Sequence, residues 1–267
     1  MSKYFSLLYD RKLEEAEKFR KSLVPNKLLK FVSLNDNPDN NSKKLLSLKN
    51  RQAWFSSINV LNDPYEFKCM YIDENKLKEH GYDEHIILKF KELLDNQVKQ
   101  WSVLSLSAAS LDCLPMWAYY TNNFSGFCVE YEVERPDAIF AVSYEPNRVP
   151  IATTIANLYL EFCKMIKRGE ETNSEVEFYS TILRCQLHSK HESWKHEREY
   201  RILFPSQADI GFNVDIQNIG LKTSKIVAGL NCSKENKERL NDISNFLGCG
   251  DVLEAKISGN SYTLFER

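Results

Sequence analysis

Two glutamates and an arginine stand close together in the last third of the chain, at Glu197, Glu199 and Arg201. Residues two apart on a β-strand point to the same face of the sheet, so a strand here would place all three side chains together. A paired carboxylate beside an arginine can orient a hydroxyl group or stabilise positive charge that develops on a sugar carbon. The alternative is a solvent-facing strand on which a Glu–Arg pair contributes little to stability.

Three histidines, His188, His191 and His196, surround this run. On a helix, the first two would lie three residues apart on one face, a spacing that can share one metal ion. No cysteine lies nearby, and the predicted helix ends between His191 and His196. We therefore expect exposed histidines at a helix end, beside Glu192, and no metal site.

Further polar side chains that could contact a ligand lie in the first quarter of the chain. Asn62 and Asp63 precede a proline, a pattern that favours an Asx-type turn. A polar group in such a rigid turn can bind a ligand, although it more often satisfies only its own backbone. Ser56 and Ser57 add hydroxyl groups at the end of a predicted strand, where residues that contact substrates commonly lie.

Trp117 and Tyr120 are the aromatic candidates for ligand binding. Near a loop, such rings could stack on a planar group, for example nicotinamide or a nucleobase. Three residues apart on a short helix, they could equally fill the core, which is the usual role of aromatic residues at that spacing.

The elements that position these residues follow from apolar periodicity and turn-forming residues. The predicted helices span residues 4–23, 42–48, 74–99, 116–120, 153–167, 175–190 and 233–246, and those at 42–48 and 233–246 begin at a capping serine. The predicted strands span residues 28–34, 52–57, 102–107, 126–132, 138–144, 199–204, 212–216, 225–230, 252–257 and 262–266. Because helices and strands do not alternate regularly, we predict an α+β fold with a mixed or antiparallel sheet flanked by helices, in a single domain of residues 1–267.

Composition and missing motifs exclude several classes of protein. The net charge of −2 gives the whole molecule no attraction to nucleic acid or anionic lipid. No apolar run reaches the roughly 18 residues that span a bilayer, and the charged start lacks a signal-peptide core, so we expect a cytoplasmic protein without membrane contact. The seven cysteines form no C-x-x-C pair, which favours buried thiols. The sequence has no phosphate loop, Walker motif or nucleophile elbow, which argues against kinases, P-loop enzymes, Rossmann dehydrogenases and α/β-hydrolases.

Short motifs along the chain form an ordered set. They are Lys30-Phe31, Trp54-Phe55-Ser56, Asn62-Asp63-Pro64-Tyr65-Glu66, Leu104-Ser105-Leu106-Ser107, Met116-Trp117 with Tyr120, Gly126-Phe127-Cys128-Val129-Glu130, and Trp194 with Glu197 and Glu199-Tyr200-Arg201. Together they resemble the bacterial family labelled domain of unknown function 2971. The resemblance runs from about Leu28 to Gly229, so the chain divides into an N-terminal helix, residues 1–27, outside the match and a family-like α+β core, residues 28–267. The label carries no established activity.

The order of elements is also similar to the ADP-ribosyltransferase fold. That order is a first strand, a helix, a second strand that ends in serine, and a late strand that bears a glutamate. That resemblance implies NAD as the bound nucleotide and substrate. Asn62, Asp63 and Arg201 are further candidate contacts on the strength of their residue types and positions alone. By this resemblance, Lys30 is the basic group that positions NAD, and Ser56 or Ser57 binds the ribose through its hydroxyl. The ring of Trp117 or Tyr120 stacks on nicotinamide. The carboxylate of Glu199 stabilises an oxocarbenium-like transition state. Two features depart from the pattern: lysine replaces the usual arginine or histidine and cannot make a forked contact, and Glu197 competes for the catalytic role.

These observations leave three functional hypotheses. The first is an NAD-dependent ADP-ribosyltransferase-like enzyme with a protein or nucleic-acid acceptor. Proteins of such families are often toxins or defence proteins, so we also expect an intracellular toxin or phage-defence effector, although no residue indicates this role. The second is a module that binds a nucleotide or another small ligand without catalysis. The third is a metal-dependent nuclease or hydrolase that uses the glutamate and histidine groups.

Overall fold

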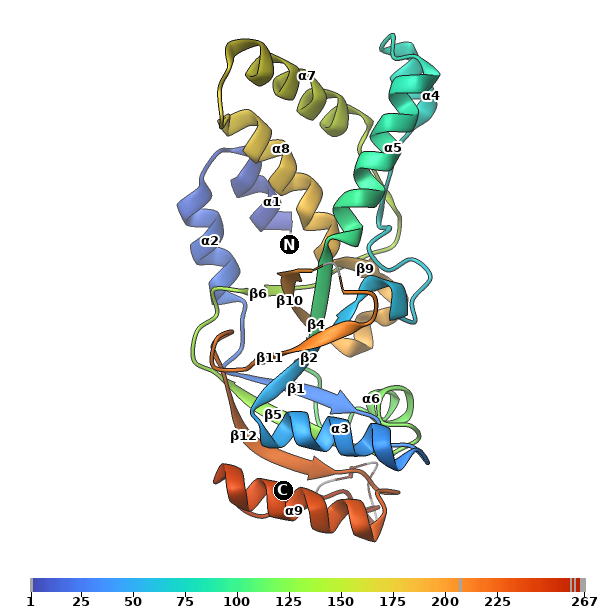
Figure 1. Cartoon of the computed structure of the whole chain (residues 1–267), viewed down its shortest axis with the longest axis vertical. Helices are drawn as coiled ribbons and strands as arrows, with labels where there is room; N and C mark the ends of the chain where they lie inside the picture. Colours follow the sequence, from blue (N-terminus) through green and yellow to red (C-terminus); the bar gives the residue numbers. More distant parts are fainter. Residues whose placement is uncertain (1, 207, 260, 262, 265–267) are drawn as a thin grey trace.

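The computed structural model describes residues 2–206, 208–259, 261, 263 and 264. The molecule is elongated, with a group of helices at one end and a sheet covered by two more helices at the other (Figure 1). Of the strand predicted at 262–266, residues 262, 265 and 266 lie outside the described residues, and residues 263 and 264 are not in a strand.

Helices and strands alternate irregularly along the chain, as predicted, and the α+β class is confirmed. The helices are α1 Ser2–Tyr9, α2 Leu13–Ser22, α3 Pro38–Lys49, α4 Glu74–Glu79, α5 Glu84–Lys99, α6 Leu114–Tyr120, α7 Ala152–Arg168, α8 Ser174–Cys185 and α9 Lys234–Leu247, and the short 3-10 helices are η1 Ile58–Val60, η2 Gln186–His188 and η3 Glu192–Glu197. The strands are β1 Lys27–Val32, β2 Gln52–Ser57, β3 Met70–Tyr71, β4 Trp101–Ser107, β5 Phe127–Val133, β6 Ile139–Ala141, β7 Ser143–Glu145, β8 Val149–Pro150, β9 Ser189–His191, β10 Glu199–Pro205, β11 Gly211–Asp215, β12 Leu221–Ala228 and β13 Leu253–Glu254.

Side-chain caps determine where several helices begin. Ser233 accepts a hydrogen bond from the backbone N–H of Asn236, so the predicted start of α9 is confirmed. The predicted serine cap of α3 is wrong: Asn37 caps that helix five residues before Ser42, and Pro38 occupies its first turn, where a missing N–H costs nothing.

Three predicted helices are longer than the observed ones. The helix predicted at 4–23 is divided into α1 and α2 near Arg11, whose φ is 60°. The helix predicted at 74–99 is divided into α4 and α5 near Gly81, whose φ is 84°. The helix predicted at 175–190 ends at Cys185, because residues 189–191 pair in parallel with β7 and form β9. Here tertiary strand pairing overrides a helical periodicity.

Strand β4 organises the main sheet, which has nine strands within the described part of the chain. Strand β10 pairs with one edge of β4 over its whole length, from Glu199 opposite Ser107 to Pro205 opposite Trp101. Two strands share the other edge, since Ser56 and Ser57 of β2 face the start of β4 whereas β1 meets only its end, at Ser107. The described registers leave residues 104–106 without a partner strand on this edge. The sheet is therefore split between β1 and β2.

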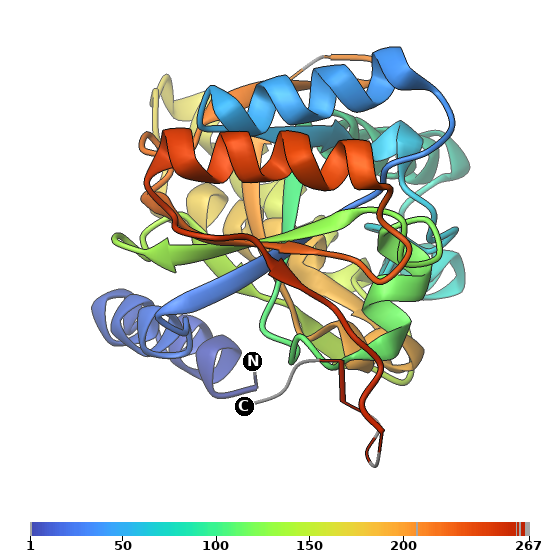
Figure 2. The same ribbon diagram turned by 90° about the horizontal axis from the view of Figure 1, so that it is seen from below.

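Helices α3 and α9 lie side by side over one face of the sheet (Figure 2). Their buried leucines, Leu45 and Leu240 among them, pack on sheet residues such as Phe55 and Leu104. The helix α6 packs on the opposite face through Trp117. At the other end of the molecule, α1 and α2 pack against α8, and α4 and α5 pack against α7.

The start of β5 passes very close to the end of β1, and a side chain at Gly126 would not fit there. A Cβ atom on this residue would lie 2.0 Å from the carbonyl oxygen of Val32. We expect Gly126→Ala to lower the free energy of unfolding by about 1–3 kcal/mol, because the backbone must move to relieve the overlap. Chemical denaturation measures this change. Gly259→Ala is the matched control, since a Cβ there meets no atom within 4 Å, and equal effects of the two variants would contradict the packing.

Candidate functional site

A cavity of about 190 Å³, the central cavity below, lies beside the part of β4 where β1 and β2 separate. It brings together residues from β1, β2, α6, η3 and β10 that are far apart in the sequence. Six of the ten predicted site residues line it: Lys30, Ser56, Asn62, Tyr120, Glu197 and Glu199.

Lys30 extends from β1 across the split in the sheet. Its Nζ donates a hydrogen bond to the backbone carbonyl of Ser105, 3.0 Å away, in the stretch of β4 that has no partner strand on this edge among the described residues. Burial lowers the pKa of the Lys30 ammonium to about 8, although the negative charge of Glu199 opposes this change. The amine is therefore close to its titration point at neutral pH.

Glu199, the first residue of β10, is buried and fully paired. Arg201 donates a hydrogen bond to each carboxylate oxygen of Glu199, from Nε at 2.8 Å and from Nη2 at 3.0 Å. Lys190 adds a contact of 3.3 Å, and Ser105 donates from its hydroxyl. Burial alone would raise the pKa of Glu199, but the charges of Arg201 and Lys190 outweigh it and lower the pKa to about 2. Glu199 is thus ionised at neutral pH.

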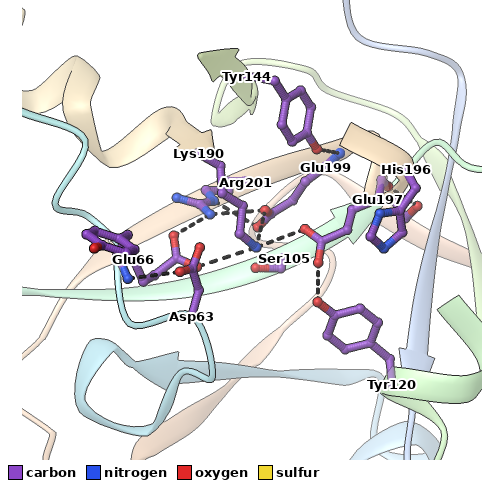
Figure 3. A network of polar contacts seen from close by, with 12 residues as sticks. Asp63, Glu66, Ser105, Tyr120, Tyr144, Lys190, His196, Glu197, Glu199 and Arg201 are labelled. Atoms are coloured by element: carbon purple, nitrogen blue, oxygen red, sulfur yellow. Dashed lines mark hydrogen bonds and ion pairs between the residues drawn. The ribbon is translucent and has the colours of Figure 1, made fainter. Parts of the chain in front are cut away.

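Glu197 reaches the same cavity from a different element. It is the last residue of η3, so the prediction that it shares a strand face with Glu199 is wrong. The left-handed backbone of Arg198, with φ of 44°, turns the chain between the two acids, and the hydroxyl of Ser107 holds the carbonyl of Glu197. Its carboxylate accepts hydrogen bonds from Lys190, at 2.8 Å, and from the Tyr120 hydroxyl (Figure 3).

The pKa of Glu197 is shifted in the opposite direction from that of Glu199. Burial raises it, the Lys190 ammonium lowers it, and the nearby charge of Glu199 raises it again, so that the pKa lies above its ordinary value. Two carboxylates in one cavity therefore differ in their proton affinity, and the difference arises because Arg201 donates hydrogen bonds to Glu199 and none to Glu197.

Sequence reasoning missed two members of this charged group, Lys190 and Glu66. The Nζ of Lys190 lies 3.5 Å from Glu66, whose other oxygen is 2.5 Å from Arg201. Three buried carboxylates thus share two buried cations (Figure 3). The only sequence feature that pointed to Glu66 was its place in the Asn62–Glu66 motif. Lys190 was not recognised as a site residue because its segment was predicted to be helical.

The structure places three predicted residues elsewhere. Trp117 is fully buried, its indole N–H donates to the carbonyl of Leu111 at 2.7 Å, and its ring packs edge-on against Phe31, so it cannot stack on a nicotinamide. Ser57 is buried and accepts the N–H of Asn59 at the start of η1. Arg201 lies behind Glu199 and positions it without facing the central cavity.

Asp63 forms the predicted Asx turn, since its Oδ1 accepts the backbone N–H of Tyr65 at 2.9 Å. The residue is 6% exposed, and its Oδ2 has no hydrogen-bond partner among the described residues. Asp63 lines a neighbouring cavity, whereas Asn62 lies exposed at the edge of the central one.

The histidines do not form the exposed helix end that was predicted. His188 is buried, its ring stacks on Phe140 with centroids 4.4 Å apart, and burial lowers its pKa to about 3. His191 ends β9 and contacts Ser193. No group of three or more His, Cys, Asp or Glu side chains within the described residues has an arrangement that could hold a metal ion.

Comparison with known proteins identifies one family. Residues 116–202 match the profile of a family described as "Protein of unknown function (DUF2971)". The match confirms the resemblance inferred from the motifs, over a shorter stretch than Leu28–Gly229, and it contains Tyr120, Lys190, Glu197 and Glu199. No curated protein and no solved structure matches the chain. Among the described helices, none has the length and apolar character needed to cross a membrane.

Replacing Arg201 tests the charge balance of the site. We expect Arg201→Leu to lower the free energy of unfolding by about 3–5 kcal/mol, because Glu199 and Glu66 would remain buried without their main cation. Denaturant titration of purified variants measures the change. Arg168→Leu, which removes an arginine from an exposed pair with Glu170, is the control and should have little effect. An equally small effect for Arg201→Leu would show that the buried group is not under electrostatic constraint.

Proposed function

We propose that this chain, which carries a DUF2971 segment at residues 116–202, is an enzyme that cleaves the nicotinamide–ribose bond of NAD and transfers the ADP-ribose group. The supporting observation is that Glu197 and Glu199 line one cavity and have pKa values shifted in opposite directions. Two carboxylates whose environments separate their pKa values are typical of sites in which one acid exchanges a proton and the other stays charged.

In this mechanism Glu199 supplies a permanent negative charge. When the bond between the ribose C1′ and the nicotinamide nitrogen breaks, its electron pair leaves with the nicotinamide, and positive charge develops on the ribose. A carboxylate held in place by Arg201 needs no reorganisation to stabilise that charge, and such fixed groups commonly lower a barrier by several kcal/mol.

Glu197 acts as the general base. The attacking hydroxyl or amine of the acceptor forms the new bond to C1′ and gives its proton to the Glu197 carboxylate. A raised pKa makes this carboxylate a stronger base than an ordinary one. The Tyr120 hydroxyl and Lys190 hold it by hydrogen bonds from two sides, which orients the accepting oxygen.

The remaining side chains of the central cavity suit a nicotinamide riboside group. Lys30 presents an ammonium that can bind a carboxamide or phosphate oxygen, and Ser56 presents a hydroxyl from the end of β2. The volume of about 190 Å³ is below the roughly 300 Å³ at which ligand pockets usually start, so the rest of a dinucleotide would lie outside it.

One observation favours a second candidate, a site that binds a nucleotide without turnover. Every carboxylate oxygen of Glu197 and Glu199 already accepts a hydrogen bond from Tyr120, Lys190 or Arg201. A charge network that is complete without a ligand is also what a purely structural or sensing site would contain.

Release of nicotinamide from NAD, with water as the acceptor, distinguishes the two candidates. We expect the wild-type protein to release nicotinamide and Glu197→Gln to be about 10²–10⁴-fold slower, because the amide cannot take a proton. Glu199→Gln should also be slower, since the fixed charge is lost. Glu192→Gln is the control, because this exposed acid of the same short helix lies outside the cavity. Nucleotide binding without release would favour the sensing site.

The pH dependence of kcat/KM gives an independent test. Activity should rise as pH increases through the pKa of Glu197, because the base must be ionised, and should fall as pH increases through about 8, because the Lys30 ammonium loses its proton. Lys30→Gln should lower kcat/KM and remove the alkaline decline. A decline near pH 8 that persists in Lys30→Gln would contradict the role given to this ammonium.

A further inference from the structure

A second cavity of about 540 Å³, called the Trp194 cavity below, shares Lys190 with the central cavity. It is formed by the Asx-turn loop, the loop before β8, and the start of η3. Its lining carries the rings of Tyr65, His191 and Trp194, the cations of Lys68, Arg148 and Lys190, and the carboxylates of Asp63 and Glu145. This composition differs from that of the central cavity, where carboxylates dominate.

The aromatic groups offer flat surfaces. Tyr65 is 59% exposed and Trp194 is partly exposed, so both rings are accessible, unlike the buried Trp117. Arg148 is held rigidly, because its Nε and Nη2 each donate to a backbone carbonyl at 2.7 Å. A flat ring that stacks on an indole, next to fixed positive charge, is the combination that binds a nucleobase with a phosphate.

Asp63 adds an acceptor to this wall. Its Oδ2 is buried without a hydrogen-bond partner among the described residues, which is unfavourable for a carboxylate oxygen. A small rotation of the side chain would bring that oxygen to a ligand hydroxyl or amino group. The exocyclic amine of adenine and the ribose diol are donors of this kind.

Lys190 connects the two cavities. Its Nζ lies 5.0 Å from the centroid of the Trp194 ring and 3.3 Å from the carboxylate of Glu199. One side chain therefore separates the aromatic surface from the proposed reaction centre. A ligand with a ring on Trp194 could extend past Lys190 into the central cavity.

We propose that the Trp194 cavity binds an adenylate group, that is, a purine ring with its ribose 5′-phosphate. The ring lies on Trp194, the phosphate faces Arg148 and Lys68, and Asp63 accepts from the adenine amine or the ribose. The identification of this group as the adenylate half of NAD rests on the proposed function, whereas the binding of adenylate itself does not.

Titration calorimetry with AMP tests this site without any reaction, because AMP lacks the nicotinamide–ribose bond. We expect AMP to bind and ribose 5-phosphate to bind at least about tenfold more weakly, since it has no ring to stack. Trp194→Leu should weaken AMP binding about tenfold to a hundredfold, and Trp194→Phe should retain most of it. Trp54→Leu, at a tryptophan that is 42% exposed on β2, is the matched control and should bind AMP as the wild type does.

Trp194 lies in η3, so Trp194→Leu could weaken AMP binding by disturbing this helix. A second pair of variants, outside η3, controls for that effect. Tyr65→Leu should weaken AMP binding, whereas Tyr119→Leu, which removes a similarly exposed tyrosine outside the cavity, should not. If the wild-type protein binds AMP but releases no nicotinamide from NAD, the proposed function is rejected and this inference stands. Absence of AMP binding, or binding that neither Trp194→Leu nor Tyr65→Leu weakens, would overturn the inference even if NAD is cleaved.

Discussion

The pairing of Lys190 and Arg201 with three buried carboxylates is the constraint on which the site depends. An unpaired charge in a protein interior costs several kcal/mol, so none of these five groups can be buried alone. Glu66 comes from the loop after β2, Lys190 from β9, and Arg201 from β10. Because each of these charges needs an opposite charge beside it, the ion pairs hold three distant segments of the chain together. This pairing also explains how two neighbouring acids acquire different proton affinities, since only one of them is gripped by the guanidinium.

The split sheet provides the space in which these charges act. In a continuous sheet, the carbonyl of Ser105 would pair with a neighbouring strand, and no cavity would exist beside β4. Because β1 and β2 diverge, the side chain of Lys30 satisfies that carbonyl instead. The divergence of β1 and β2 therefore accounts both for the gap beside β4 and for the position of the Lys30 ammonium. The large cores under α3, α9 and α6 help to keep the strands in these positions.

Local patterns in the sequence predicted most elements but few of the contacts. The serine cap of α9 and the alternating pattern of β10 depend on neighbouring residues, which explains why Glu199 and Arg201 were assigned correctly to one strand face. The positions of Lys190, Glu197 and Trp117 depend on partners far away in the chain. Lys190 follows from the pairing of β9 with β7, Glu197 from the turn at Arg198, and Trp117 from space under β1 that only the folded chain defines. Hydrophobic periodicity carries no information about these partners.

The backbone of Arg198 has a consequence for how the two acids move. A residue other than glycine in the left-handed region is strained by about 1 kcal/mol or more, and glycine would remove that strain. Glycine would also widen the conformational range of the joint between η3 and β10. With arginine there, and with its carbonyl bound by the N–H of Ala108 at 3.0 Å, the joint has little torsional freedom. The chain thus accepts a local loss of stability in return for stiffness, so that neither acid can swing away from the other between encounters with a ligand.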